Sequence, residues 1–407
     1  MEKIQIGTGL AGSPRLLYVV THGMSARHLL RGQLSWMRKA GYVVAVAASP
    51  GEELEQTAEV EGVEVIPVQI CREIKPFSDV KSLRSLLLAM RRWQPDIVYA
   101  ATPKGGLLGM LAAAALGVPA RIYGQWGLRL ETASRSTRRL LWATERMACR
   151  VAHRVHAAGP SLAQRCLELD LVSNNKVFIT GSGSTNGVDC SRFVSPPVDE
   201  VSGLRDRLGL SGGEPVIGFV GRLTRDKGIP ELVNAFESLA QDYPDARLVL
   251  FGEAESGDPV DTSVLSQISA NSSILAPGFI RDPAVAYPLM SVLAFPSHRE
   301  GFPNVPLEAA AAGIPVVGAR STGTVDAVVD GETGSLVPVG DSDALSAALR
   351  RYIADADLRE RHGRAARQRV EREFSRERVW NSLSAEYAEL LHAAGRPVPG
   401  FGNKISL

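Results

Sequence analysis

The chain has 407 residues, which is long enough for two or three domains with a sizeable core. Its composition, 45% hydrophobic and 22% charged residues, is that of an ordinary soluble α/β protein. A formal net charge of +1, with basic residues that are not interleaved with aromatic ones, argues against a nucleic-acid-binding protein.

The charge is divided unevenly along the chain. Residues 1–195 contain 24 Lys and Arg against 15 Asp and Glu, whereas residues 196–407 contain 21 against 29. This difference has two interpretations: a drift between two surfaces, or a basic half that meets an anionic surface such as phospholipid or a lipid diphosphate.

Cysteine spacing and apolar runs indicate the compartment. The four cysteines are far apart and form no Cys-x-x-Cys pair, which is typical of reduced thiols in a cytosolic protein. The first fourteen residues lack the apolar region of a signal peptide. The longest uncharged run, Gly105 to Ala120, is too short to span a bilayer and predicts a tightly packed interior helix. We therefore expect a cytoplasmic protein whose membrane contact is peripheral, on the inner face.

The first half alternates apolar strands with helices. The strands are predicted at residues 16–21, 43–49, 63–70, 96–101, 121–125, 154–158 and 176–180, and the helices at 25–40, from 52, and at 80–93, 106–116 and 137–152. This order predicts a parallel sheet covered by helices on both faces.

A linker and a second round of alternation follow. Residues 195–215 contain Pro196-Pro197 and Gly212-Gly213 and are typical of a linker with one short helix. Beyond it, strands are predicted at 216–220, 247–251, 274–275, 292–295 and 315–319, and helices at 231–239, 259–270, 304–312 and from 343 onward, with Asp341 or Asp343 as an N-cap.

The sequence thus predicts an α/β protein with two doubly wound domains facing each other across a cleft that binds ligands. The N-terminal domain is predicted to span residues 1–195 and the C-terminal domain residues 196–407. Part of the helix predicted over residues 375–395 is expected to pack back on the first domain.

Two glutamates, Glu300 and Glu308, bracket a turn between a strand and a helix. The strand ends at Phe295, and the helix is predicted to begin at Asn304. In open α/β sheets ligands bind at the carboxyl ends of strands, and a helix N-terminus offers free N–H groups to an anion. One carboxylate on each side of the turn suits a nucleotide sugar, with its two hydroxyl-rich parts. The alternative is a helix-capping carboxylate plus a solvated one.

A second strand also ends in a charged, glycine-rich loop. The run 216–220 leads into Gly221-Arg222 and, after four residues, Lys227-Gly228. The glycines permit close approach of a ligand to the backbone, and the two cations can neutralise a diphosphate. A solvated basic turn is the alternative.

Together, these motifs resemble those of glycosyltransferase family 4, whose members are retaining enzymes with two Rossmann-like domains, the GT-B fold. The resemblance covers nearly the whole chain and includes Pro103-Lys104-Gly105-Gly106 and Asn186-Gly187-Val188-Asp189. Bacterial members typically build capsule, O-antigen or other glycans on a polyprenyl-diphosphate carrier at the cytoplasmic membrane face. The resemblance implies a UDP-sugar donor, with GDP as the alternative, and transfer of a hexose or N-acetylhexosamine to a lipid-linked or glycan acceptor.

The resemblance also implies residue roles. Arg222 and Lys227 would bind the donor diphosphate and stabilise charge on the leaving nucleotide, Glu300 would bind the sugar hydroxyls, and Glu308 the ribose. The other implied donor-binding residues are Gly23, Gly221, Gly301, Phe302, Pro303 and Asn304, with Phe279 and Ile280 in the base-binding loop.

One stretch departs from the family pattern. Many relatives carry His-Gly after the fifth strand, where this chain has Trp126-Gly127, so no side-chain base is identified. Trp126 and His22 are candidates for contact with the acceptor or sugar, although a lone histidine in a strand-end turn is more often structural. His153 and His156 lack partners with ligand spacing and are interpreted as structural.

No metal or cofactor is expected. Asp341-Ser342-Asp343 and Asp355-Ala356-Asp357 resemble the Asp-x-Asp motif of metal-dependent transferases, but both lie among C-terminal helices. Helix capping explains them better.

The helix predicted over residues 137–152 carries a basic stripe. Such a stripe with a tryptophan is what a peripheral helix presents to anionic lipid, and the alternative is an ordinary solvated face. The residues assigned to membrane docking are Arg135, Arg138, Arg139, Trp142 and Arg146.

Two further functions share the predicted architecture: a UDP-sugar epimerase or phosphorylase-like enzyme, and a non-catalytic sugar-nucleotide-binding subunit. The Glu pair together with the Arg/Lys loop favours sugar transfer. Loss of Glu300, Arg222 or Lys227 would have indicated the non-catalytic subunit, and all three are present.

Overall fold

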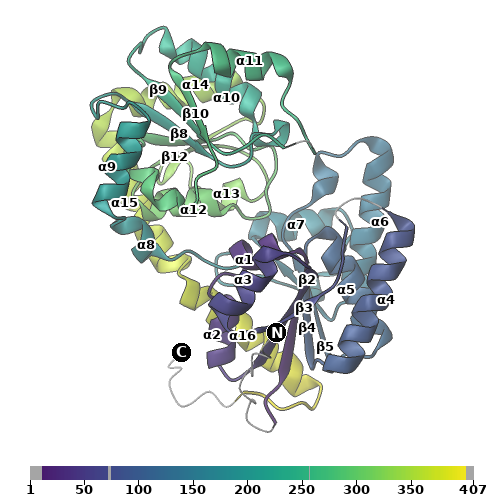
Figure 1. Ribbon diagram of the computed structural model, residues 1–407. Coiled ribbons are helices and arrows are strands. Elements are labelled where there is room, and N and C mark those ends of the chain that lie inside the picture. The colour runs from purple at the N-terminus through teal and green to yellow at the C-terminus, as the bar shows by residue number, and fades with distance from the viewer. Residues whose placement is uncertain (1–11, 72–74, 256, 400–407) are drawn as a thin grey trace. The chain divides into compact units, whose positions relative to one another are not determined.

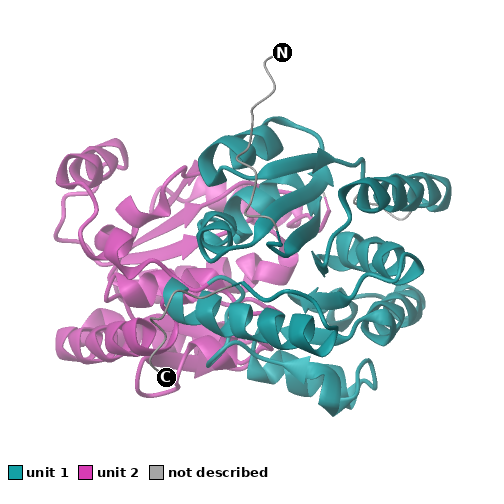
Figure 2. Ribbon diagram, turned by 90° about the horizontal axis from the view of Figure 1, so that it is seen from below, with its two compact units in different colours: residues 1–186, 376–407 teal, residues 187–375 magenta. Residues whose placement is uncertain are grey.

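The computed structural model describes residues 12–71, 75–255 and 257–399. The chain forms two compact units, which Figure 2 shows in different colours. Unit 1 comprises Met1–Asn186 together with Arg376–Leu407, and unit 2 comprises Gly187–Ser375. The unit boundary at Asn186 lies upstream of the predicted domain boundary at Ser195.

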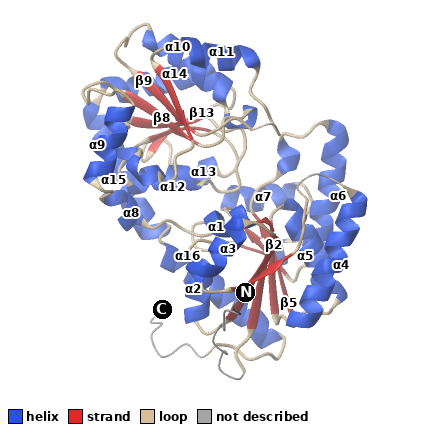
Figure 3. Cartoon of the chain, viewed as in Figure 1, coloured by secondary structure: helices blue, strands red, loops and turns tan. Residues whose placement is uncertain are grey.

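Unit 1 is built on a seven-stranded parallel sheet (Figure 3). The strand order is β3-β2-β1-β4-β5-β6-β7, so the chain starts in the middle and winds outward in both directions. Its strands are β1 (Arg15–His22), β2 (Val43–Ser49), β3 (Glu64–Pro67), β4 (Ile97–Ala101), β5 (Ala120–Gln125), β6 (Arg154–Ala157) and β7 (Val177–Phe178).

Helices cover both faces of this sheet (Figure 1). Alternate residues of β1 show the two faces: Leu16, Tyr18 and Val20 share a core with α16, whereas Val19 meets α5. The helices of unit 1 are α1 (Gly23–Leu29), α2 (Gln33–Lys39), α3 (Glu52–Glu61), α4 (Pro76–Trp93), α5 (Pro103–Ala115), α6 (Arg135–Val151), α7 (Pro160–Glu168) and α16 (Arg376–Ala393).

One helix prediction in this unit is wrong, and one helix was missed. The helix predicted over residues 25–40 is two helices, because Gly32 adopts a left-handed conformation (φ 80°). The Glu61 carboxylate fixes this break by accepting hydrogen bonds from the backbone N–H groups of Gly32 (2.6 Å) and Ser35 (3.0 Å). Helix α7 was not predicted at all.

The uncharged run is an interior helix, as predicted. A Cβ on Gly106 of α5 would lie 2.3 Å from the ring of Tyr123, and one on Gly109 would lie 2.7 Å from the Cβ of Ala100. Small residues are therefore required where α5 packs on the sheet.

Unit 2 repeats the architecture with a six-stranded parallel sheet of order β10-β9-β8-β11-β12-β13. Its strands are β8 (Val216–Val220), β9 (Arg247–Phe251), β10 (Ile274–Gly278), β11 (Val292–Phe295), β12 (Val316–Ala319) and β13 (Gly334–Val337). Its helices are α8 (Cys190–Val194), α9 (Val198–Arg207), α10 (Ile229–Ala240), α11 (Thr262–Ala270), α12 (Asn304–Ala311), α13 (Thr324–Ala327), α14 (Ser342–Ala354) and α15 (Ala356–Glu373). Strand β13 and helices α8 and α13 were not predicted.

The Asp-x-Asp sequences are helix caps, as predicted. Asp341 accepts a hydrogen bond from the N–H of Ala344 (2.8 Å) at the start of α14, and Asp355 accepts one from Leu358 (2.8 Å) at the start of α15. The four cysteines are free. Among the described residues, none of the helices combines the length and the apolar character needed to cross a bilayer.

Candidate active site

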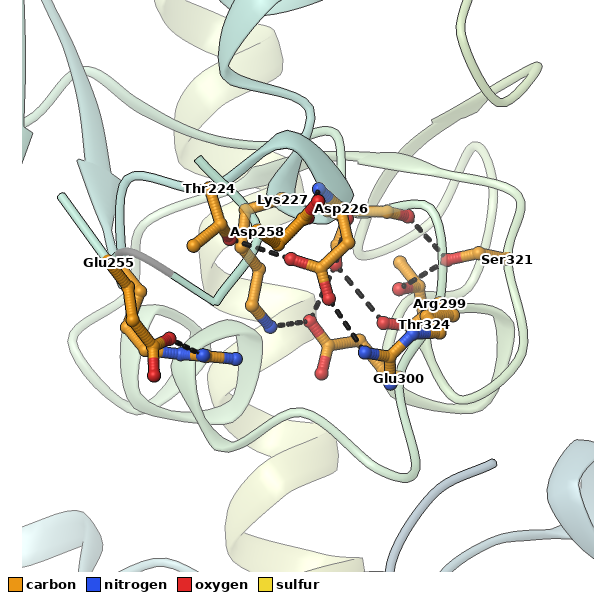
Figure 4. A network of polar contacts seen from close by, with 11 residues as sticks. Thr224, Asp226, Lys227, Glu255, Asp258, Arg299, Glu300, Ser321 and Thr324 are labelled. Carbon is orange, nitrogen blue, oxygen red and sulfur yellow. Dashed lines mark hydrogen bonds and ion pairs between the residues drawn. The ribbon is translucent and has the colours of Figure 1, made fainter. Parts of the chain in front are cut away.

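The two motif loops of unit 2 lie at the carboxyl ends of neighbouring strands. β8 and β11 pair in the centre of the sheet, so the loop after β8 (residues 221–228) and the loop after β11 (residues 296–303) emerge side by side. Figure 4 shows their side chains converging. This is the edge at which open α/β sheets bind ligands.

Lys227 and Glu300 join the two loops directly. The Nζ of Lys227 forms an ion pair with Oε1 of Glu300, and both side chains are largely buried. The same Glu300 oxygen accepts a hydrogen bond from Oγ of Ser297 (2.7 Å), while the Glu300 N–H donates to the carbonyl of Thr322 (3.0 Å). Both residues are therefore held in position by their surroundings.

Asp226 joins the loops that carry Lys227 and Glu300. Its carboxylate accepts hydrogen bonds from Oγ1 of Thr224 (2.6 Å) and from Nη2 of Arg299 (2.8 Å), and its N–H donates to Asp258 (2.7 Å). Burial alone would raise the pKa of Asp226, but the Thr224 hydrogen bond and the Arg299 charge outweigh it, so the pKa lies below its ordinary value. Asp226 thus links three loops and remains ionised.

Glycines allow the loops to approach this closely. Gly228 is left-handed (φ 72°), and a Cβ there would lie 2.3 Å from the carbonyl oxygen of Pro296. Gly323, in the loop after β12, has φ 77°, and its Cβ would lie 2.6 Å from the carbonyl oxygen of Gly301. The position of Glu300 therefore depends on a glycine in a third loop.

Arg222 is the more exposed of the two cations and forms an ion pair with Glu255, in the loop after β9.

His298 forms an ion pair with Glu231 of α10 (Nε2 to Oε1, 2.9 Å), and this hydrogen bond raises the pKa of His298 above its ordinary value. The His298–Glu231 pair therefore connects the start of the Glu300 loop to helix α10, which follows Lys227.

The remaining predicted donor-binding residues of unit 2 are distributed differently. Glu308, on α12, accepts a hydrogen bond from the hydroxyl of buried Tyr287 (2.8 Å). Phe302 is a core residue whose ring lies 5.3 Å from that of Phe374, so only its backbone is available to a ligand. Phe279 follows β10 at the end of the sheet and is exposed, with half-buried Ile280 beside it.

The unit 1 candidates have structural partners of their own. His22 ends β1 and Gly23 begins α1, where a Cβ would lie 2.7 Å from the backbone nitrogen of Leu54. Trp126 donates a hydrogen bond through its indole N–H to the hydroxyl of Tyr99 (3.0 Å), which in turn contacts Nδ1 of His156 (2.8 Å). Burial lowers the pKa of His156 to about 3, and this histidine is structural, as predicted.

The basic stripe on α6 is only partly free. The Trp142 indole donates to the carbonyl of Leu169 (2.8 Å), and Arg146 pairs with Asp170 while lying over the Trp142 ring. Arg135, Arg138 and Arg139 are exposed.

The residues that position Glu300 and Lys227 were not predicted from the sequence. One group of them could have been found, because the polar residues Ser297, His298 and Arg299 immediately precede Glu300 in the sequence. The Gly323 loop and Asp258 had no signal, because their relevance follows from strand order. Within the described ranges no cluster of three or more His, Cys, Asp or Glu side chains could hold a metal ion.

Two family models match the chain. The family model "Glycosyl transferases group 1" matches residues 202–369, which include both motif loops, and "Glycosyl transferase 4-like domain" matches residues 26–183. The chain is 36% identical over 377 residues to the capsular polysaccharide biosynthesis glycosyltransferase CapM of Staphylococcus aureus, covering 93% of this chain and 97% of CapM.

Two more similarities extend the comparison. The Escherichia coli UDP-Gal:alpha-D-GlcNAc-diphosphoundecaprenol alpha-1,3-galactosyltransferase is 27% identical over 293 residues, covering 71% of this chain and 74% of that protein. The structure of Anabaena HepE in complex with UDP and glucose superposes with a TM-score of 0.78 at 20% identity, covering 92% of this chain and 100% of HepE, which shows a common fold. The chain therefore belongs to glycosyltransferase family 4, has the GT-B fold, and is a glycosyltransferase that uses a nucleotide sugar.

Proposed function

We propose that the protein is a retaining glycosyltransferase that moves a sugar from a UDP-sugar to a polyprenyl-diphosphate-linked glycan in surface polysaccharide synthesis. The observation that carries this proposal is the direct contact between Lys227 and Glu300. It places a cation suited to phosphate beside a carboxylate suited to sugar hydroxyls, on neighbouring strands of one sheet.

The donor diphosphate is assigned to Lys227 and Arg222. Helices α10 and α12 begin beside these loops, and within the described residues neither has a side-chain cap, in contrast to α14 and α15 with their aspartates. Their first-turn N–H groups are therefore suited to phosphate oxygens. A diphosphate would compete with Glu255 for Arg222.

The proposed chemistry follows from where charge develops. Sugar transfer builds positive charge at the anomeric carbon and negative charge on the leaving diphosphate, which the two cations stabilise. Glu300 orients the sugar through its hydroxyls. Glu308, assigned to the ribose, is held by Tyr287 and does not serve as a nucleophile. The leaving phosphate accepts the acceptor's proton on the same face, and the anomeric configuration is retained.

The donor and acceptor classes are supported by the relatives. CapM is named for capsular polysaccharide synthesis, and the Escherichia coli enzyme for transfer of galactose from UDP-Gal to a diphosphoundecaprenol-linked acceptor. A lipid-linked acceptor requires access to a membrane surface, and the exposed arginines of α6 are suited to anionic lipid.

Calorimetry tests the donor site. UDP, GDP and ADP are titrated without added metal into the wild type and into Lys227→Ala. We expect selective binding of UDP that is lost in the variant. Binding of GDP alone would show that the donor is a GDP-sugar instead of a UDP-sugar. Binding of none of the three nucleotides would refute the proposal.

Product analysis tests the reaction type. With a UDP-sugar and a polyprenyl-diphosphate-linked glycan, we expect a new glycosidic bond whose anomeric configuration, measured by NMR, matches that of the donor. An inverted product would refute retention, and isomerisation of the donor sugar without transfer would indicate the epimerase.

A further inference from the structure

Helix α4 exposes three large apolar side chains that the fold does not use. Phe77 is 89% exposed, Val80 68% and Leu88 60%. At 3.6 residues per turn the three lie on one side of the helix, within a sector of about 80°. The opposite side, with Leu86, Met90 and Trp93, is buried.

The same side of α4 is cationic. Lys81, Arg84, Arg91 and Arg92 are exposed and lie within about 60° of Phe77 on a helical projection. The one acidic residue of α4, Asp79, is turned away and pairs with Lys104 of α5 (2.7 Å). The exposed face of α4 is therefore apolar and positively charged, which is the pattern of a helix lying in the interface of an anionic bilayer.

Helix α6 extends this surface. Both α4 and α6 pack against α5 on the same side of the unit 1 sheet (Figure 1). Exposed Arg138 and Arg139 add charge, but Trp142, the aromatic residue assigned to membrane docking, is half-buried and donates its indole N–H to Leu169. Helix α6 also exposes Leu140 (48%) and Met147 (45%), but less than the 60–89% of the three α4 side chains, so α4 offers the larger apolar surface to a bilayer.

An exposed apolar residue elsewhere provides a contrast. Val60 on α3 is 58% exposed, but the acidic residues Glu52, Glu53, Glu55 and Glu59 share its helix. Charge complementarity with anionic lipid is present on α4 and absent from the described residues of α3.

We propose that α4 is the main membrane-docking element, with Phe77, Val80 and Leu88 inserted at the headgroup boundary of an anionic phospholipid bilayer and Lys81 and Arg84 facing its phosphates. This deepens the proposed function, on which it rests for the lipid-linked acceptor. It assigns α6 a supporting electrostatic role.

Vesicle sedimentation tests the proposal. The wild type is mixed at low salt with vesicles of phosphatidylglycerol and phosphatidylcholine, or of phosphatidylcholine alone. We expect binding to the anionic vesicles, weakened about tenfold or more by the double substitution Phe77→Ser and Leu88→Ser. Lys81→Glu with Arg84→Glu is expected to abolish the preference for anionic vesicles.

Matched variants control for surface changes in general. Val60→Ser is expected to bind vesicles as the wild type does, whereas Val80→Ser, the same substitution on α4, binds more weakly. Absence of vesicle binding by the wild type, or α4 variants that bind normally, would overturn the proposal. Equal loss in Val60→Ser would overturn it as well.

A second readout separates this proposal from the proposed function. UDP binding is measured on the same proteins, since α4 belongs to unit 1 and Lys227 and Glu300 to unit 2. Normal UDP binding without vesicle binding overturns membrane docking alone. Vesicle binding through α4 without UDP binding overturns the donor assignment alone.

Discussion

The two units share one architecture but differ in the polar chemistry at their strand ends. In both units the fully buried polar side chains are mostly neutral, and in unit 1 they include the chain from Tyr99 to His156 that Trp126 joins. In unit 2 the strand-end loops gather ion pairs, including Lys227–Glu300 and Arg299–Asp226. The same fold thus supports a mostly neutral interior in both units and a cluster of ion pairs at the strand ends of unit 2.

The location of these ion pairs does not follow the net charge of the two halves of the sequence. The basic half carries many of its cations on outer helices such as α4 and α6. The acidic half contains Lys227 and Arg222, the cations assigned to the donor. Position at a strand end, rather than net charge, is therefore the basis of the proposed anion site.

The largest expected effect tests whether the charged site is specific. Lys227→Ala is expected to lower the rate of transfer by about 10²–10³, or about 3–4 kcal/mol, because it removes a preorganised cation from the leaving diphosphate. Arg225→Ala is the matched control, since Arg225 lies two residues away in an exposed ion pair with Asp261. Steady-state kinetics measures both. Equal losses would show that the loop acts through its general charge.

The next effect tests the neutral interior of unit 1. Glu145 is buried on α6, accepting hydrogen bonds from Tyr123 (2.6 Å) and Gln125 (2.9 Å), and burial raises its pKa from 4.5 to about 7. Protonated Glu145 makes its full contribution to the free energy of unfolding below pH 4.5. This contribution is lost as the pH rises through about 7.

Glu145→Gln is therefore expected to be more stable than the wild type at pH 8, by an amount on the order of 3 kcal/mol, and to lose this advantage below pH 4.5. Urea unfolding at several pH values measures the difference. Exposed Glu168→Gln is the control and is expected to give no gain. A Glu145→Gln difference that does not change with pH would contradict the neutral-interior interpretation.

A smaller effect separates backbone strain from loop position. Gly323→Ala and Gly313→Ala both place a Cβ at positive φ, 77° and 78°, which costs about 1–2 kcal/mol of stability. Only at Gly323 does that Cβ meet the Glu300 loop, whereas at Gly313 no atom lies within 4 Å.

We expect both variants to lose stability but only Gly323→Ala to lose activity, by about tenfold or more, because Glu300 is displaced. Thermal unfolding and transfer rates are measured in parallel. Equal activity in the two variants would mean that the Glu300 loop tolerates displacement.

The smallest effect concerns the His298–Glu231 pair. The raised pKa of His298 contributes stability that is present below its ordinary value of 6.5 and is lost as the pH rises through the raised value. The pKa of Glu231 is lowered, so ionised Glu231 makes its full contribution to stability above about pH 4.5.

His298→Gln is thus expected to cost less than about 1 kcal/mol between pH 5 and 6.5, and less at pH 9, because the pair is partly exposed. Glu231→Gln should show the same profile in urea unfolding. A cost that grows with pH would contradict this sign.

The sequence predicted most of the sheet because buried parallel strands are apolar runs bounded by breakers. β2, β8, β9 and β11 have the predicted bounds. β13 was missed because it opens with Gly334 and Ser335, which leaves only Leu336 and Val337 as an apolar run. Glu145 was missed as a buried residue because burial of a single carboxyl follows from what packs against it and leaves no pattern in the sequence.

The sequence by itself determined the two rounds of strand–helix alternation and the charged loops at strand ends, because these are local properties of periodicity and turn chemistry. Only the tertiary structure decided that Lys227 contacts Glu300 and that Gly323 supports it. Those contacts follow from β8 pairing with β11 and β11 with β12, an order set by long-range packing of the sheet and its helices.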